Sequence, residues 1–578
     1  MSQNIAETNT KQRPLPTEDV HEKKAEDECY YLFRVLPVEY PKFFSLAFLG
    51  LSISFIYSTL RDGKDTLVMS RMLPTSISFL KSTMVLISTM AFGIFFQMLM
   101  SKGVKMRTIM IGAHVVFASY FLVYALVIFP FREQIEPYKY AVMDMFADGK
   151  MKVNGLEFLN GFLCIFNCWT GSLFYVAAEM WGSVVLSLLF FGCVNELCLL
   201  RQALRFYPLF LIAANLALVG SGLIGVVVSS LATSDQFIET FYKYFLLGIA
   251  GLSVVNIFVY KYLMDRVVPY PLYIVDGPPA PKKSKTKVGL MAGIKMAFSN
   301  RIILCMSISV LAYGVVTNLT ESAINSSTVQ AADARGSSAA SIGQAAANAV
   351  SEAHKTKAAK VMYTKAIQQI NIGTVTILFL ISPLKNLIQT RGWLSLGLLS
   401  PIFSLIGSTI LFMVMWLNVQ TDSKSTGFLA TLARSLGQKL TPDTQKRLNL
   451  EVNIGVIVVS AIKILKYAAF DICKEAIGVK IPKEHRSRLK GVYDGVFGKL
   501  GKSTSAAVQI ILLGIINTND IRQAVLIIGS ASILITILWL YATVYLSKQY
   551  TQAVKDGRDL PVAPTEDATT TNQAAAQP

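Results

Sequence analysis

The sequence contains few charged residues and very little histidine. Only 16% of its 578 residues are charged, against about 25% in soluble domains. The four histidines, His21, His114, His354 and His485, are far apart in the chain. A zinc centre or a histidine-based catalytic triad is therefore not expected. We expect no metal site and no cofactor.

The cysteines give no sign of metal binding either. None has a histidine at metal-ligand spacing, and most lie inside apolar runs, where cysteine is a small hydrophobic residue. The seven are Cys29, Cys164, Cys168, Cys193, Cys198, Cys305 and Cys473.

Long apolar runs are what the sequence has in abundance. Hydrophobic residues make up 53% of the chain, and the mean hydropathy is +0.48. A run of about 20 apolar residues can cross a bilayer as a helix that satisfies its own backbone hydrogen bonds. The expected fold class is an all-α polytopic membrane protein.

The net charge of +18 comes from 54 Lys and Arg against 36 Asp and Glu. Much of the excess falls in short loops between apolar runs, where the positive-inside rule places it in the cytoplasm. A nucleic-acid surface would combine one basic face with interleaved aromatics, and the sequence has none. The expected partner is the lipid bilayer and not nucleic acid.

The apolar runs predict twelve transmembrane helices. The fourth run would be about 65 Å long as one helix, twice the hydrocarbon thickness. Two crossings would move the basic segment 201–205 outside, so we expect one long or broken crossing. The runs are 43–60, 77–100, 107–130, 155–199, 206–232, 241–264, 301–320, 365–386, 394–417, 453–480, 491–517 and 521–547.

The runs form two similar halves, 43–264 and 301–547, of six helices each. In both, a short basic loop follows the second run and a longer polar loop precedes the fourth. We expect the proline-rich, basic segment 265–300 to be a cytoplasmic linker and the Ala/Ser-rich loop 326–360 to be flexible or loosely helical. Residues 1–42 form a polar cytoplasmic tail, too acidic for a transit peptide. Residues 548–578 form a disordered tail.

Charged residues interrupt these apolar runs at matching positions. The cluster from Arg61 to Asp65 ends the first run, and Glu179, Glu321 and Lys474 lie on the fourth, seventh and tenth. Each charge costs roughly 2.5 to 3.5 kcal/mol at a helix centre on insertion scales. We therefore predict a transport site between the halves. A solvated helix end at the first cluster remains an alternative.

Five motifs in order resemble the nucleotide transporter family of ATP/ADP translocases, found in plastids, intracellular bacteria and microsporidia. The resemblance runs from about residue 30 to 548. It implies a major-facilitator-like fold of twelve helices and a protein that exchanges ATP for ADP. The motifs are Arg61-Asp-Gly-Lys-Asp-Thr-Leu-Val68, Glu179-Met-Trp-Gly-Ser-Val-Val185, Arg205-Phe-Tyr-Pro-Leu-Phe210, Phe470-Asp-Ile-Cys-Lys-Glu475 and Gly501-Lys-Ser503.

Carried over by motif, the family's important charges fall on Lys64, Glu179, Glu321 and Lys474. The two lysines, with Arg61, would neutralise phosphate oxygens. The two glutamates would hold the lysines in the empty state.

Four further residues are secondary candidates for the substrate site: Asp65, Asp471, Glu475 and Lys502. An ion pair of Lys474 with Asp471 or Glu475 could instead be structural. The segment Gly495 to Ser503 resembles a phosphate-binding loop, but its spacing is wrong and no strand precedes it, so we predict no enzyme.

The predicted function is exchange of ATP for ADP by alternating access. Net import of purine nucleotides coupled to protons or phosphate is an alternative within transport. A nucleotide-gated channel or receptor is an alternative of another class. We expect the plasma membrane of an intracellular parasite, microsporidian or bacterial, with an organelle membrane as the other option.

Overall fold

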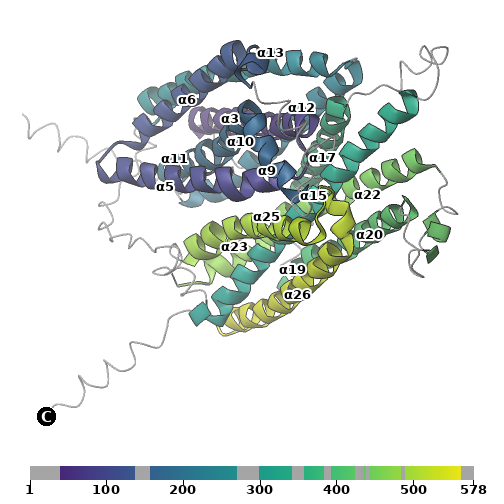
Figure 1. Ribbon diagram of the computed structural model, residues 1–578. Helices are drawn as coiled ribbons and strands as arrows, with labels where there is room; N and C mark the ends of the chain where they lie inside the picture. The colour runs from purple at the N-terminus through teal and green to yellow at the C-terminus, as the bar shows by residue number, and fades with distance from the viewer. Residues whose placement is uncertain are drawn as a thin grey trace, which may run out of the picture.

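In the computed structural model every regular element among the described residues is a helix (Figure 1). The described residues are 35, 39–136, 157–198, 200–232, 234–269, 298–340, 357–382, 392–422, 431–432, 434–437, 443–482 and 489–561. Most of the two tails, most of the central linker and the middle of the Ala/Ser-rich loop, which the sequence analysis interpreted, lie outside these residues.

Twelve helical segments among the described residues are long and apolar enough to cross a membrane, as the sequence predicts. The first six are built from α3 (Tyr40–Arg71), α4 (Ser76–Leu80) with α5 (Leu86–Ser101), α6 (Met106–Val123), α10 (Trp169–Met180) with α11 (Phe191–Leu197), α12 (Leu200–Leu231) and α13 (Asp235–Tyr262). The other six are built from α15 (Arg301–Ala340), α17 (Lys357–Ile381), α19 (Trp393–Gly397) with α20 (Leu399–Asp422), α22 (Thr444–Leu465) with α23 (Asp471–Val479), α25 (Phe497–Ile516) and α26 (Val525–Lys555).

The long fourth run makes a single crossing. A short helix, α9 (Asn160–Asn167), ends at Cys168, whose backbone leaves the helical region, and α10 restarts at Trp169. Only the segment from Trp169 to Leu197 is long enough to span. This confirms the prediction of one broken crossing.

The seventh span is longer than its apolar run. Residues 326–340 of the predicted Ala/Ser-rich loop continue α15, and residues 357–360 begin α17. The small residues that made this segment look coreless let α22 approach closely, since Ala331 packs with Leu448 and Val452. The predicted tail likewise starts too early, because α26 continues to Lys555.

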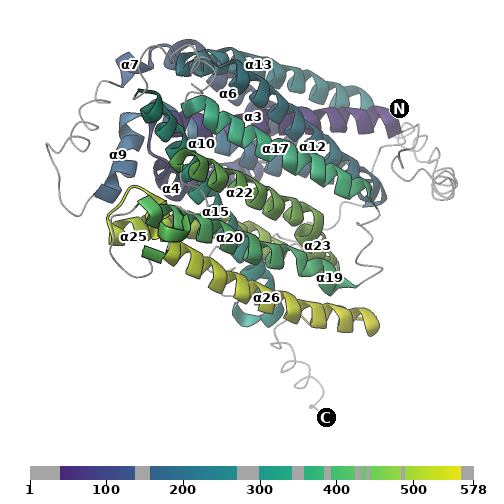
Figure 2. The ribbon, with the colours of Figure 1, turned by 90° about the vertical axis from the view of Figure 1, so that its right-hand side faces the viewer.

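Both ends of the helical body lie at one face, which we call the tail face, since α3 begins there and α26 ends there (Figure 2). The opposite face carries the short helices α7 (Arg132–Ile135) and η12 (Ile521–Ala524), and we call it the loop face. Most helices of the first half and of the second half lie in two neighbouring groups, and α17 of the second half lies beside α12 of the first.

Two seams join the halves. In each, the fifth span of one half packs on the second span of the other. In one, the fifth span, α12, packs on the second span of the other half, α17. The backbones come close: a Cβ added to Gly222 would lie 2.8 Å from the carbonyl oxygen of Ala366, and one added to Gly373 would lie 2.8 Å from that of Asn215. In the other seam α4 packs on α25, where Ser78 donates a 2.5 Å hydrogen bond to Gln509. Matched seams of this kind fit two repeated halves around one axis.

The halves are sealed together at the loop face. We call this apolar cluster the loop-face seal, and it draws side chains from both halves: Val68, Met69, Met72, Ile77, Phe79, Leu80, Cys164, Ile165, Cys168, Tyr175, Val329 and Val361. At the tail face, among the described residues, the core around Ile303, Cys473 and Tyr493 contains second-half side chains alone. Of these two apolar clusters, only the one at the loop face joins the halves.

Candidate functional site

Lys64 lies at the centre of the first half's charged cluster. Its Nζ is 2.7 Å from Oδ1 of Asp65 and 3.1 Å from Oε1 of Glu179 on α10. The same ammonium lies 3.9 Å from the ring centroid of Tyr175, within range of a cation–π interaction. Only 3% of the Lys64 side chain is exposed. A buried ammonium is therefore paired with two carboxylates on its own half.

The second half carries the same kind of pair with the charges reversed. On α15, Glu321 accepts a short hydrogen bond from Lys463 on α22. The first and fourth spans thus pair lysine with glutamate, and the seventh and tenth pair glutamate with lysine. Glu321 also lies within electrostatic range of Lys365 and Lys81.

Lysines on the second span of each half reach across to the other half. Lys365 on α17 lies 3.2 Å from Asp65 on α3. Lys81 on the second span of the first half donates a 3.1 Å hydrogen bond to Asn318 on α15. In both contacts, a lysine on the second span of one half reaches the first span of the other half, so the two contacts occupy equivalent positions in the repeat. The cluster therefore lies between the halves and belongs to both.

Arg61 and Lys502 complete the cluster. The Arg61 guanidinium stands 5.9 Å from the Tyr57 ring centroid and interacts electrostatically with Glu321. Lys502 on α25 interacts with Glu179 and with Glu321. Asp62 on α3 interacts electrostatically with Arg61 and Lys365. The central cluster is then Arg61, Asp62, Lys64, Asp65, Lys81, Glu179, Glu321, Lys365, Lys463 and Lys502. Six cations against four carboxylates leave it with an excess of two positive charges.

Part of the central cluster is accessible to solvent, although its residues lie inside the helical body. The side chains of Glu179 and Glu321 are 18% and 20% exposed. Lys502 is exposed, though it lies on a helix packed against α15 and the first half. A solvated, positively charged interior between two helical halves is suited to an anion that enters from one face.

Wide π-helical turns accompany three of these charges. One begins at Lys81 (Lys81–Val85), one follows Glu179 (Trp181–Phe190), and one follows Lys463 (Lys466–Phe470). Such turns are rare and are frequent at functional sites, because they redirect side chains and leave backbone groups less constrained. The recurrence in the fourth and tenth spans follows the repeat of the two halves.

The structure does not bring Lys474 together with the other predicted charges. Its Nζ lies 3.1 Å from Asp471 and 2.6 Å from Asp494, in a group of its own nearer the tail face. Glu475 pairs with Lys490, where both side chains are about half exposed. Three of the four main sequence candidates, with Arg61, Asp65 and Lys502, are in the central cluster. Lys474, Asp471 and Glu475 are not.

Sequence reasoning missed Lys81, Lys365 and Lys463. Lys463 lies in the middle of the tenth apolar run, and a lysine at that depth is itself a sign of an internal partner. Lys81 and Lys365 stand near the ends of their runs, where a lysine more often extends to the membrane surface. Only the packing of the helices shows that these two point inward.

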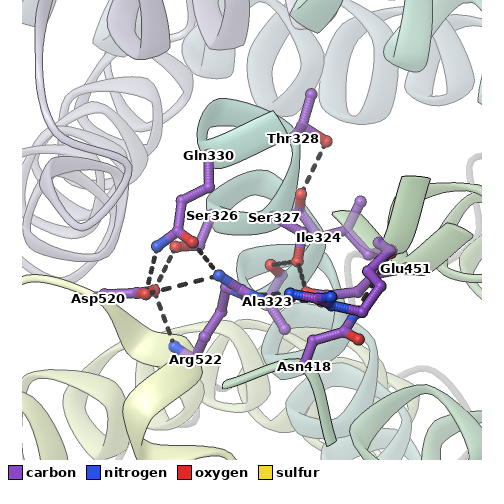
Figure 3. Close-up of polar contacts among 11 residues, drawn as sticks. Ala323, Ile324, Ser326, Ser327, Thr328, Gln330, Asn418, Glu451, Asp520 and Arg522 are labelled. Atoms are coloured by element: carbon purple, nitrogen blue, oxygen red, sulfur yellow. Dashed lines mark hydrogen bonds and ion pairs between the residues drawn. The ribbon is translucent and has the colours of Figure 1, made fainter. Parts of the chain in front are cut away.

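A second buried network fixes the helices that carry Glu321 and Lys463. Near the loop face, Glu451 on α22 accepts two 2.9 Å hydrogen bonds from Arg522 and one of 2.8 Å from Asn418 on α20 (Figure 3).

The same network includes α15, because Ser327 donates a 2.5 Å hydrogen bond to Glu451 and Ser326 a 2.7 Å bond to Asp520. Glu451 is fully buried and accepts bonds on both oxygens. The network therefore joins four helices of the second half at one end.

The family model of the TLC ATP/ADP transporter matches residues 19–332 and 347–550 of this chain. The chain belongs to the TLC ATP/ADP transporter family. This confirms the resemblance read from the motifs and places the chain among transporters and not enzymes. The relatives below match this chain over most of its length.

The chain is 33% identical over 562 residues to ADP,ATP carrier protein 1 of Encephalitozoon cuniculi, covering 96% of this chain and 95% of that protein. It is 31% identical over 555 residues to ADP,ATP carrier protein 1 of Paranosema grylli, covering 95% of each. To ADP,ATP carrier protein 1 of Rickettsia prowazekii it is 27% identical over 517 residues, covering 89% and 94%.

Among solved structures, a nucleoside transporter superposes with a TM-score of 0.49 at 11% identity, covering 86% of this chain and 99% of that one. A bacterial homologue of the iron transporter ferroportin gives 0.48 at 11% identity, covering 88% and 99%.

Proposed function

We propose that this protein exchanges ATP for ADP across a membrane by alternating access. The observation that carries the proposal is the central cluster, in which both halves supply cations to one place and leave an excess of positive charge. The relatives named above are ADP,ATP carriers, which agrees with a nucleotide as the anion.

The carboxylates of the cluster explain how the empty site is kept stable. Lys64 and Lys463 each have a glutamate partner, so neither ammonium is left alone in the interior. Phosphate oxygens of an entering nucleotide would replace these carboxylates around the lysines, because charge-assisted contacts to phosphate are strong. The glutamates then hold the lysines in position before binding and release them during it.

The closed seal favours a state that opens at the tail face. If the positive-inside rule holds for the basic loops, the tail face is cytoplasmic, and this state accepts nucleotide from the cytoplasm. Opening the loop face requires the seal to part and the halves to rock about the bound nucleotide. Since side chains from both halves surround one site, binding of the nucleotide and rocking of the halves are coupled.

Purified protein in liposomes loaded with ADP tests this function. Labelled ATP should enter, unlabelled ADP should compete with it, and a variant with the central lysines Lys64 and Lys463 both changed to Gln should not transport. GTP and inorganic phosphate as competitors define whether other purine nucleotides or phosphate also bind. Failure of ADP to compete with ATP would contradict the proposal.

The organisms of the relatives also suggest in which membrane the protein lies. The three relatives come from two microsporidia and a rickettsia, so we propose the surface membrane of an intracellular parasite, where exchange would bring in host ATP. Immunolocalisation against markers of the surface and of organelle membranes decides between the two.

A further inference from the structure

One carboxylate holds a cation from each half of the protein. Asp65 on α3 receives Lys64 of its own half at 2.7 Å on one oxygen. Its other oxygen lies 3.2 Å from Lys365 on α17 of the other half. In the loaded carrier, a nucleotide phosphate would bridge cations of both halves in the same way. Asp65 is thus an internal substitute for that phosphate.

The bridge lies directly beneath the loop-face seal. Val68 and Met69 follow Asp65 by three and four residues, and Val361 precedes Lys365 by four, and all three belong to the seal. Residues spaced three or four apart share one face of a helix. When the seal parts to open the loop face, α3 and α17 must separate at the level of Asp65 and Lys365.

We propose that Asp65 and Lys365 are the coupling pair that makes transport depend on exchange. This inference rests on the proposed exchange of nucleotides. In the empty carrier the pair keeps the loop face closed. In the loaded carrier a phosphate group takes over Lys365, Asp65 keeps Lys64, and the halves are free to rock.

The burial of the pair explains why the empty carrier stays closed. The side chains are 12% exposed for Asp65 and 7% for Lys365. Pulling them apart without a replacement leaves Lys365, which is almost fully buried, without its direct carboxylate partner, and this is strongly unfavourable. A bound phosphate removes this obstacle because it provides the replacement anion. Only a loaded carrier then reorients quickly, which is the condition for obligatory exchange.

The related contact in the other half is a hydrogen bond and not a direct ion pair. There Lys81 donates to the amide oxygen of Asn318 at 3.1 Å. This contact is a hydrogen bond to a neutral amide, and the nearby Glu321 keeps its direct partner Lys463 when Lys81 moves away, so the contact opposes opening less strongly than an ion pair would. The two halves therefore differ at the position that decides coupling, and we assign the coupling to Asp65 and Lys365.

The first experiment compares ATP uptake by liposomes that contain ADP with uptake by liposomes that contain no nucleotide. In the wild type, uptake should be at least about tenfold faster with internal ADP. In Asp65→Asn and in Lys365→Gln we expect this ratio to fall by about tenfold, toward one. Asp265→Asn is the matched control, because it removes a carboxylate from an exposed ion pair with Arg107 inside the first half. The control should keep the wild-type ratio.

The second experiment does not depend on transport. Cys164 and Cys168 of the seal are 7% and 1% exposed, so their modification by a charged maleimide reports opening of the loop face. With protein in nanodiscs and no nucleotide, labelling of the peptide that carries them should be slow in the wild type and several-fold faster in both variants. Added ATP should accelerate labelling of the wild type.

The two experiments separate failure of the inference from failure of the function. Wild-type protein that does not exchange ATP for ADP would refute the proposed function, while the labelling still tests the closed state. Variants that keep both the wild-type ratio and the slow labelling would overturn the coupling pair. If one variant does not fold, the other tests the same contact from its opposite partner.

Discussion

The pairing of Glu321 with Lys463 leads to a prediction in which a second substitution restores activity. Lys463→Gln removes a cation of the proposed phosphate site and leaves Glu321 without its direct ion partner. Loss of one charge-assisted contact costs about 1.5 to 3 kcal/mol. The freed carboxylate, taken at roughly 7 Å from a phosphate charge with an effective dielectric constant of about 20, adds about 2 kcal/mol of repulsion.

The single variant should therefore lose roughly a thousandfold in the apparent Vmax/KM for ATP, since each tenfold is about 1.4 kcal/mol. The double variant Lys463→Gln with Glu321→Gln lacks the repulsion. It should lose only about 10- to 100-fold. Neutralising Glu321 on top of Lys463 should thus increase the transport rate, although both residues belong to the site.

Initial rates of ATP entry into ADP-loaded liposomes, at ATP concentrations well below KM, measure this difference. Lys357→Gln is the control, because Lys357 is a partly exposed lysine 3.5 Å from Asp333 near the loop face. It should stay within about twofold of the wild type. A double variant as slow as the product of the two single effects would refute the pairing as the reason for the loss.

Three further variants and one physical condition follow from the structure. Lys474→Gln should reduce the apparent Vmax/KM by less than about tenfold, because its contacts are with acidic residues outside the central cluster; exchange rates check this. Gly501→Leu should destabilise the protein by about 1 to 3 kcal/mol, since even a Cβ there would lie 3.0 Å from the backbone oxygen of Leu311; thermal unfolding in detergent measures it. Arg522→Met should cost about 3 to 5 kcal/mol by stranding Glu451, and adding Glu451→Met should recover part of the loss in the same assay. A membrane potential of about 100 mV should shift the distribution of ATP against ADP by up to about 50-fold, because the two differ by about one charge; ion-clamped liposomes show it.

Most of the architecture could be predicted because apolar runs report directly on membrane helices. The single crossing of the fourth run could be predicted as well, because the basic segment after it must lie on the cytoplasmic side. The extent of α15 could not be predicted from composition. Alanine and serine lack the bulk that marks a core, yet they allow α22 to pack closely beside Ala331.

Within the site, Lys64, Glu179 and Glu321 could be found from charge at membrane depth. The choice of Lys474 over Lys463 shows the limit of motifs. The two lysines are 11 residues apart on the tenth span, about 16 Å along its axis, with the π-helical turn Lys466–Phe470 between them. The position of each lysine along the span decides which one contacts Glu321. Lys463 stands mid-span and Lys474 only five residues before α23 ends at Val479.

The central claim is one site that exchanges one nucleotide for another. Its most direct test counts labelled ATP that enters and labelled ADP that leaves the same liposomes at the same time. The account predicts one ADP out for each ATP in, and almost no ATP entry when the liposomes contain no nucleotide. Equal entry into loaded and empty liposomes would contradict it and would indicate net import instead.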